Sequence, residues 1–317
     1  MPQKQQEQRK EHDQHLDHPA ADIGEPKSTA EDHSVHIYFF SGNPYVYALY
    51  DNLLSLLRIR GHAKGHRIST LLVTYPSLPD FFLADPQAAF AYIAKDVHQQ
   101  IWAHERARHS PSPTHTILVG HSFGAYIANL LLPHLTPVPI ASIYLFPFLS
   151  EPSWRGKLQL ALADQAYRRT PFLGSALHGV TSRLFDWVLR FISSPFKRQS
   201  LGGGIGPETL RAILRVAACE RAEIGGKGPD LSHVDMHGER HGSMPYLVYT
   251  EGDEWSPRYV WDAWPEERRV DMSHVPHAFP CHEAHDEEVC QTVLQIVGKV
   301  VGGHEGKEAL TDTRARL

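Results

Sequence analysis

One serine of this sequence has the neighbours expected of an enzymatic nucleophile. Ser122 lies between Gly120 and Gly124, with the apolar run TILVG (116–120) before it and apolar residues at helical spacing after it. A strand that turns sharply into a helix needs glycine on both sides, because a Cβ would collide with the neighbouring backbone. Such a turn raises the serine hydroxyl above the sheet, beside the N–H groups that begin the helix. We therefore predict that Ser122 is a nucleophile; the alternative is a chance G-x-S-x-G in an ordinary turn.

A nucleophilic serine needs a histidine base, and the base needs a carboxylate that fixes its tautomer and stabilises its charge. Around a turn of this kind the acid and then the base follow the serine along the chain. Asp253 lies where one predicted strand ends, and His277 lies in the loop after the next predicted strand. We predict that Asp253 and His277 complete a triad with Ser122. The other carboxylates considered for the acid are Glu254, Asp262, Asp271 and, as the main alternative, Glu151.

An oxyanion hole needs two N–H donors that face the reacting carbonyl oxygen. One comes from the residue after the nucleophile, here Phe123, and the other from the loop after the first core strand. That loop reads FFSGNPY, in which Pro44 has no N–H and Gly42 permits close backbone approach. We therefore predict Asn43 as the second donor; an ordinary Asn-Pro turn is the alternative.

The remaining polar residues indicate no metal, cofactor or nucleic-acid site. The histidine clusters at 233–241 and 274–285 show no i, i+4 helical pair with a nearby carboxylate, except His233 and His237 in a segment broken by glycine. A net charge of −5, with both signs mixed along the chain, gives no basic surface for nucleic acid. We expect no metal, no cofactor and no nucleic acid. The three scattered cysteines favour a reducing, intracellular compartment over a disulfide framework.

Apolar runs of strand length alternate with helical patterns along most of the chain. The runs lack polar alternation, which is typical of strands buried on both faces. They cover 35–40, 68–75, 116–120, 140–146, 246–250 and 269–275. This order predicts an α/β fold, a mainly parallel sheet with helices on both faces.

The alternation defines the expected domain organisation. The α/β core is expected over 35–150 and 245–303, interrupted at 151–244 by helical patterns that predict a cap or lid insertion. Residues 1–34 are polar, with neither a signal peptide nor a membrane span, and predict a disordered tail. Residues 304–317 predict a flexible C-terminal tail.

Four segments together resemble the lipid droplet-associated hydrolases of the α/β-hydrolase superfamily. They are FFSGNPYVYALYDNLLSLL, VGHSFGAYIANLLLP, YTEGDEWSP and VPHAF. The resemblance implies an α/β-hydrolase fold, with Ser122 as nucleophile, Asp253 as acid and His277 as base. It also implies an ester hydrolase that acts on neutral lipids or sterol esters, with a helical cap that contacts lipid droplets. This sequence departs from the family in its polar N-terminal region and in its cap.

Two segments bear on where the protein works. In SRLFDWVLRFISSPFKR, an apolar stripe flanked by Arg and Lys could lie in a lipid interface; the alternative is that it packs on the core. The stripe consists of Leu184, Val188, Phe191 and Ile192. The ending Ala315-Arg316-Leu317 is similar to the tripeptide that a peroxisomal import receptor recognises. We expect a lipid droplet or associated membrane surface, with the peroxisome as the alternative.

The chemistry expected of this sequence is hydrolysis of a lipid ester through an acyl-enzyme on Ser122. Two other hypotheses stay open. The first is a peroxisomal acyl thioesterase or acyltransferase, which the C-terminal tripeptide motivates. The second is a weakly active protein that binds the surface of lipid droplets.

Overall fold

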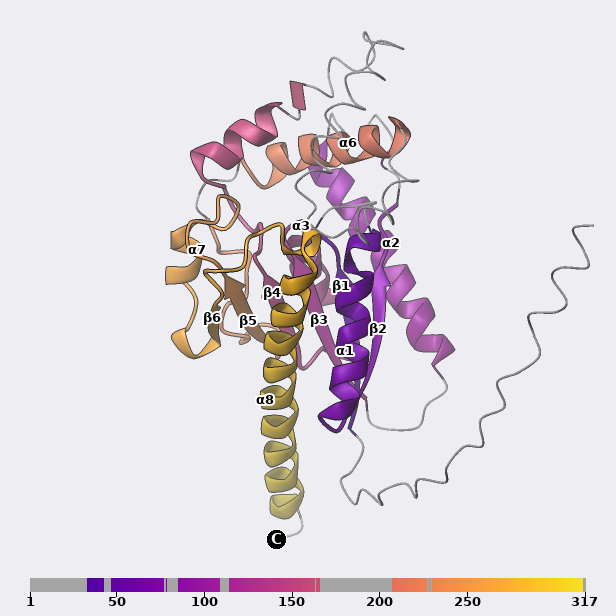
Figure 1. Cartoon of the computed structure of the whole chain (residues 1–317). Helices are drawn as coiled ribbons and strands as arrows, with labels where there is room; N and C mark the ends of the chain where they lie inside the picture. The colour runs from indigo at the N-terminus through magenta and orange to yellow at the C-terminus, as the bar shows by residue number, and fades with distance from the viewer. Residues whose placement is uncertain are drawn as a thin grey trace, which may run out of the picture. The chain divides into compact units, whose positions relative to one another are not determined.

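A parallel β-sheet forms the centre of the protein (Figure 1). The computed structural model describes residues 33–42, 47–76, 78, 85–108, 114–162, 164–165, 207–226, 228 and 230–315. Its six strands lie in the order β2-β1-β3-β4-β5-β6, and every neighbouring pair is parallel. They are β1 (His33–Phe40), β2 (His66–Val73), β3 (Thr114–His121), β4 (Ala141–Leu145), β5 (Met244–Tyr249) and β6 (Arg269–Asp271). The predicted parallel α/β sheet is therefore confirmed.

The inner strands are mainly apolar because both faces of the sheet are covered. In β1, Ile37 and Phe39 belong to one buried cluster, whereas Tyr38 and Phe40 belong to the other. Successive strand residues point to opposite faces, so a strand buried on both sides shows no polar alternation.

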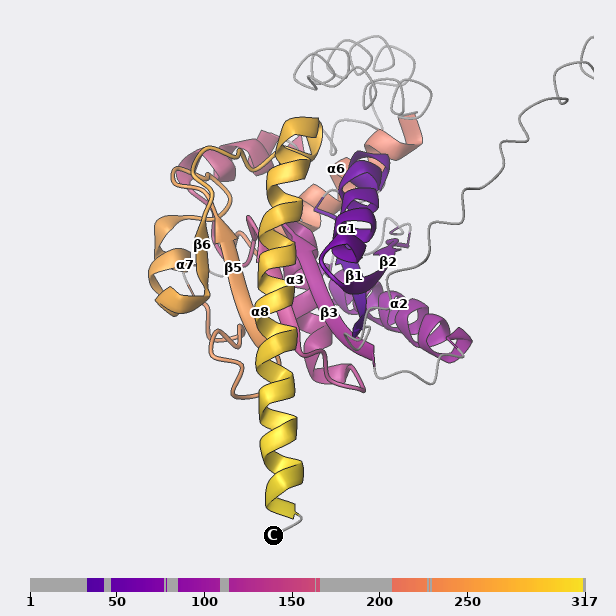
Figure 2. The ribbon, with the colours of Figure 1, turned by 60° about the horizontal axis from the view of Figure 1, so that its bottom comes forward.

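Two pairs of helices cover the two faces, as Figure 2 shows. On one face lie α2 (Pro86–Ala107) and α3 (Phe123–Leu131), and on the other α1 (Asp51–Ala63) and α8 (Glu283–Ala315). The sequence marks the start of α2, since Pro86 occupies its first turn and the Asp85 carboxylate accepts the Ala88 N–H at 2.9 Å. Such a cap stabilises a helix by about 1 kcal/mol.

Shorter elements complete the described chain. They are α6 (Pro207–Glu223), α7 (Arg258–Asp262), a helix over 154–162, and the 3-10 turns η1 (Tyr47–Tyr50), η3 (Leu132–His134), η4 (Glu266–Arg268) and η5 (Phe279–Cys281). Both α6 and the 154–162 helix fall in the predicted insertion, between β4 and β5. The predicted apolar stripe at 184–192 lies outside the described residues. None of the helices in the described part of the chain has the length and apolar character needed to cross a bilayer.

The helix α8 continues to Ala315, through residues for which the sequence predicts a flexible tail from 304 onward. Its extension EGKEALTDTRA contains Glu, Lys, Ala, Leu and Arg, which have high intrinsic helix propensity.

A buried histidine lies between the sheet and the end of α2. His36 is 1% exposed; its Nδ1 lies 2.6 Å from Ser69 Oγ on β2, and its ring stacks on His104 at 4.6 Å. Its Nε2 is buried and has no hydrogen-bond partner among the residues that the structure describes. Burial, with smaller contributions from Arg108 and His104, lowers the pKa of His36 to about 3.

The lowered pKa of His36 predicts that the folded protein loses stability in mild acid. The unfolded chain protonates His36 below about pH 6.5, whereas the folded protein keeps it neutral, so the free energy of unfolding falls as the pH drops. Between pH 7 and pH 5 the expected loss is about 2 kcal/mol. Denaturant titrations across this range should show a shallower loss for His36→Gln than for wild type. The exposed His62→Gln is the matched control, and equal slopes for wild type and His36→Gln would contradict the prediction.

Candidate active site

The turn between β3 and α3 holds Ser122 in an unusual backbone conformation. Its φ is 51° and its ψ is −121°, a region that residues other than glycine rarely adopt. The Ser122 N–H donates to the Leu145 carbonyl at 3.0 Å, and the Ser122 carbonyl accepts the Ala125 N–H at 3.0 Å. These bonds keep the strained residue in place and direct its side chain out of the turn.

The glycines near Ser122 lie where no side chain fits. A Cβ on Gly120 would lie 2.6 Å from the Ala125 Cα, and one on Gly124 would lie 2.2 Å from the Phe40 carbonyl oxygen. Gly42 is equally confined, since its Cβ would lie 2.8 Å from the Cβ of Ser122. The turn can therefore approach β1 only because these three positions carry no side chain.

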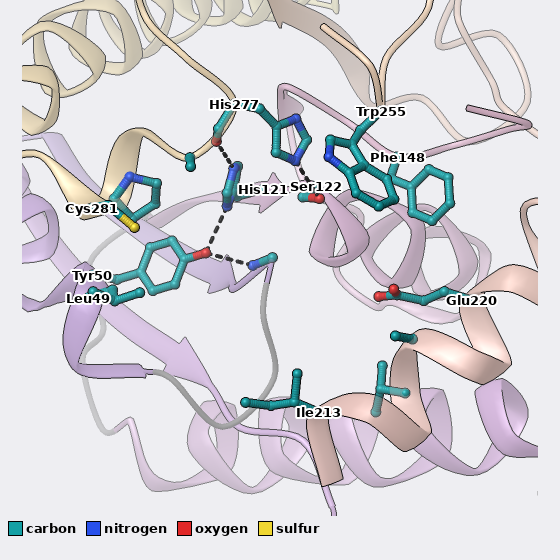
Figure 3. Close-up of a pocket in the computed structure, with 15 residues that line it drawn as sticks. Leu49, Tyr50, His121, Ser122, Phe148, Ile213, Glu220, Trp255, His277 and Cys281 are labelled. Atoms are coloured by element: carbon teal, nitrogen blue, oxygen red, sulfur yellow. Dashed lines mark hydrogen bonds between the residues drawn. The ribbon is translucent and has the colours of Figure 1, made fainter. Parts of the chain in front are cut away.

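The structure brings Ser122, His277 and Asp253 together. His277 Nε2 lies 2.8 Å from Ser122 Oγ (Figure 3), and His277 Nδ1 lies 2.8 Å from Asp253 Oδ2. The Asp253 side chain is fully buried, and its other oxygen accepts the Trp255 N–H at 2.9 Å. A carboxylate only accepts, so Nδ1 carries the proton and Nε2 is free to accept from the serine hydroxyl. The three groups have the arrangement of a nucleophile, a base and an orienting acid.

The other four carboxylates considered for the acid face different partners. The pairs are Glu151 with Lys157, Glu254 with Arg155, Asp262 with Arg258, and Asp271 with Ser273. Asp253 alone among these five candidates forms a hydrogen bond to His277 in the described part of the chain.

The predicted oxyanion donors are placed only in part. Phe123 is the first residue of α3, so its N–H has no acceptor within the helix. Its ring is buried against Phe90 and Tyr75. Asn43 lies outside the described residues. The N–H of the preceding Gly42 donates to the Tyr50 hydroxyl at 2.8 Å and is therefore engaged.

A buried hydrogen-bond chain through His121 connects the parts of the site (Figure 3). His121 Nε2 lies 3.0 Å from the His277 carbonyl oxygen, which can only accept, so this nitrogen donates. Burial holds the pKa of His121 well below its usual value, so the ring is neutral and Nδ1 accepts. Tyr50 donates to Nδ1 at 2.7 Å and accepts the Gly42 N–H. Gly42 just after β1, the turn at Ser122 and the loop that carries His277 are thus held together.

The sequence analysis did not assign His121 or Tyr50 to the site. His121 is the variable residue of the G-x-S-x-G pattern, and Tyr50 is 71 positions away from it. Tyr50 lies on η1, which follows β1, and His121 ends β3; because β1 and β3 are parallel neighbours, the chain leaves both strands at the same edge of the sheet.

A cavity of about 280 Å³ opens beside Ser122. Its walls are mainly apolar, and they come from η1, from loops at the carboxyl ends of the strands and from α6. The lining side chains include Leu49, Phe148, Ile213, Val216, Glu220 and Trp255. The arrangement can hold an apolar ligand against the serine hydroxyl.

A family model described as the alpha/beta hydrolase family matches residues 37–292. The chain belongs to the alpha/beta hydrolase family. The α/β-hydrolase fold implied by the sequence resemblance is thereby confirmed, while the narrower lipid droplet-associated family is not shown. No protein among the curated sequences matches this alpha/beta hydrolase.

Several solved structures share the fold of this alpha/beta hydrolase. Epoxide hydrolase VrEH1 from Vigna radiata has a TM-score of 0.56 and 13% identity, over 85% of this chain and 93% of that one. The peroxisomal alpha-beta-hydrolase Lpx1 from Saccharomyces cerevisiae has a TM-score of 0.53 and 13% identity, over 87% and 80%. A laboratory-evolved variant of potato epoxide hydrolase StEH1 has a TM-score of 0.52 and 14% identity, over 84% and 93%. At these identities the similarity concerns the fold alone.

The hydrogen bonds of the Tyr50 hydroxyl predict that its removal lowers activity. Tyr50→Phe leaves His121 Nδ1 and the Gly42 N–H without their present partner, and each such buried group costs about 1–3 kcal/mol. We expect kcat with an ester substrate to fall about tenfold, with a smaller change in KM, because the base loop and the oxyanion loop lose their alignment. Steady-state kinetics and Tm should be measured beside Tyr92→Phe, an exposed control on α2. An unchanged kcat in Tyr50→Phe would show that the hydrogen bonds through Tyr50 and His121 do not contribute to catalysis.

Proposed function

We propose that this alpha/beta hydrolase cleaves carboxylic esters of lipids through an acyl-enzyme on Ser122. The observation that carries the proposal is the hydrogen-bonded series Ser122–His277–Asp253, with both contacts at 2.8 Å. The apolar cavity beside the hydroxyl supports a substrate with hydrocarbon character. The quoted motifs, which resemble lipid droplet-associated hydrolases, favour a neutral lipid or a sterol ester.

In the first half of the reaction, His277 Nε2 takes the proton of Ser122 as Oγ attacks the ester carbonyl carbon. Negative charge collects on the former carbonyl oxygen, which the Phe123 N–H and, as predicted, the Asn43 N–H would stabilise. Asp253 stabilises the imidazolium. The tetrahedral intermediate then expels the alkoxide, which leaves as the alcohol with the proton from His277.

In the second half, His277 accepts a proton from water, and the resulting hydroxide attacks the acyl-enzyme carbonyl carbon. Collapse of this second intermediate breaks the bond to Ser122 Oγ. The serine regains its proton from His277, and the carboxylic acid is released.

The proposal predicts that one serine is responsible for both labelling and turnover. Ser122→Ala should abolish reaction with a fluorophosphonate probe and lower kcat by roughly 10⁴–10⁶, because the members of a triad act as a unit. Asp253→Asn should also be severely impaired, since the imidazole would lose its orienting acceptor. Mass spectrometry of the labelled peptide and turnover of lipid esters and acyl-CoA are the measurements.

Ser232→Ala, an exposed serine on a loop, is the matched control for these variants. Ester hydrolysis that persists in Ser122→Ala would remove this residue from the mechanism. Turnover of acyl-CoA with none of oxygen esters would instead establish the thioesterase alternative.

We also propose that the protein acts at a lipid droplet or associated membrane surface, on the sequence of the 184–192 stripe. Buried apolar area and nearby cations both favour binding to such an interface. Leu184→Asp with Val188→Asp should shift an N-terminally tagged protein from floating lipid droplets to the unbound fraction, whereas Ser193→Asp with Ser194→Asp should not. A purely peroxisomal signal in imaging, lost when Ala315-Arg316-Leu317 is deleted, would contradict the proposal.

A further inference from the structure

One wall of the cavity carries a carboxyl group that the triad does not use. Glu220 lies on α6, and Figure 3 shows its side chain reaching into the space between Ser122 and Ile213. The side chains around it are mainly apolar and include Val216, Phe148 and Trp255. An acyl chain alone would be better accommodated by an apolar residue here, because placing a carboxyl in such surroundings costs solvation.

The Glu220 carboxyl forms no hydrogen bond or ion pair with any residue that the structure describes. Burial alone raises its pKa to about 8, so near pH 7 it is mainly a neutral acid. In that form it has one O–H donor and a carbonyl acceptor, both available to a ligand.

The titratable groups around Glu220 do not offer it a fixed cation. Those that line the cavity are Tyr50, His121, His277 and Cys281, and the neighbouring Tyr75 and Cys219 sense its charge. His121 is neutral and bonded on both ring nitrogens, and both ring nitrogens of His277 are engaged by Ser122 and Asp253. None of the residues that the structure describes supplies Glu220 with a complementary group, which leaves the ligand as its partner in the inference below.

We propose that Glu220 determines specificity by binding a hydroxyl group of the ester substrate. A hydroxyl suits the protonated carboxyl, because it can donate to the carbonyl oxygen and accept from the O–H at once. The hydroxyl belongs either to the alcohol part, as in a partial glyceride, or to a hydroxylated acyl chain. The inference rests on the proposed function, in which Ser122 attacks the same ester.

A site built around a hydrogen bond discriminates against the analogue that lacks the partner. For one neutral hydrogen bond the expected preference in kcat/KM is about tenfold over an ester of the same length without the hydroxyl. The difference should appear mainly in KM, since the contact lies away from the reacting carbonyl and is made before and during the reaction.

Two pairs of substrates separate the two positions of the hydroxyl. On the acyl side, p-nitrophenyl 8-hydroxyoctanoate is compared with p-nitrophenyl octanoate. On the alcohol side, monooctanoylglycerol is compared with propyl octanoate. We expect wild-type protein to prefer the hydroxylated member of one pair, and that pair identifies the part of the substrate that faces α6.

Three variants test whether Glu220 is responsible. Glu220→Leu removes donor and acceptor and should abolish the preference, so that kcat/KM becomes equal for the two members of the pair. Glu220→Gln keeps a donor and an acceptor and should retain most of the preference. Glu223→Leu, on the same helix but absent from the lining of this cavity, is the matched control.

Probe labelling distinguishes failure of this inference from failure of the proposed function. Each variant should label at Ser122 with a fluorophosphonate and keep a cooperative melting transition. Absence of labelling in wild type would overturn the proposed function itself. With labelling intact, equal rates within both pairs, an unchanged preference in Glu220→Leu, or a stronger preference for an 8-amino ester than for the 8-hydroxy ester would overturn the role of Glu220.

Discussion

The close approach of α3 to the end of β1 is the constraint on which the site depends. A Cβ at Gly124 would lie 2.2 Å from the Phe40 carbonyl oxygen, so the two backbones meet without any side chain between them. To enter α3 at this distance the chain must pass through a positive φ at Ser122. This strained conformation directs the Ser122 hydroxyl toward His277. It also places the hydroxyl beside the first N–H groups of α3, which have no acceptor within the helix.

Electrostatics around this turn depend on burial more than on ion pairs. Asp253 is fully buried and accepts two hydrogen bonds, from His277 and the Trp255 N–H. His121 has no opposite charge beside it and is held neutral, so it can serve as donor and acceptor at once. Burial also raises the pKa of the Glu220 carboxyl. Loss of solvation thus lowers the pKa of the His121 imidazole and raises that of the Glu220 carboxyl, because burial disfavours the charged form of each group.

The fold and the meeting of Ser122, Asp253 and His277 could be predicted from sequence because they follow from local patterns and chain order. Strands buried on both faces are visible as unbroken apolar runs, and parallel strands bring residues at their carboxyl ends to one edge. His121, Tyr50 and Glu220 could not be assigned in this way, since their roles arise from burial and contacts between distant elements. The continuation of α8 past residue 304 was missed because its polar composition also suits a tail.

The helix α6 enters the chain between β4 and β5, which are themselves hydrogen-bonded neighbours in the sheet. The segment that contributes the α6 wall of the cavity is therefore an insertion between two strands that pair directly with each other. Replacement of that insertion would leave Ser122, Asp253 and His277 on their own strands and loops. Sequence changes in the segment between β4 and β5 can therefore alter which ligands fit the cavity without changing the elements that position Ser122, Asp253 and His277.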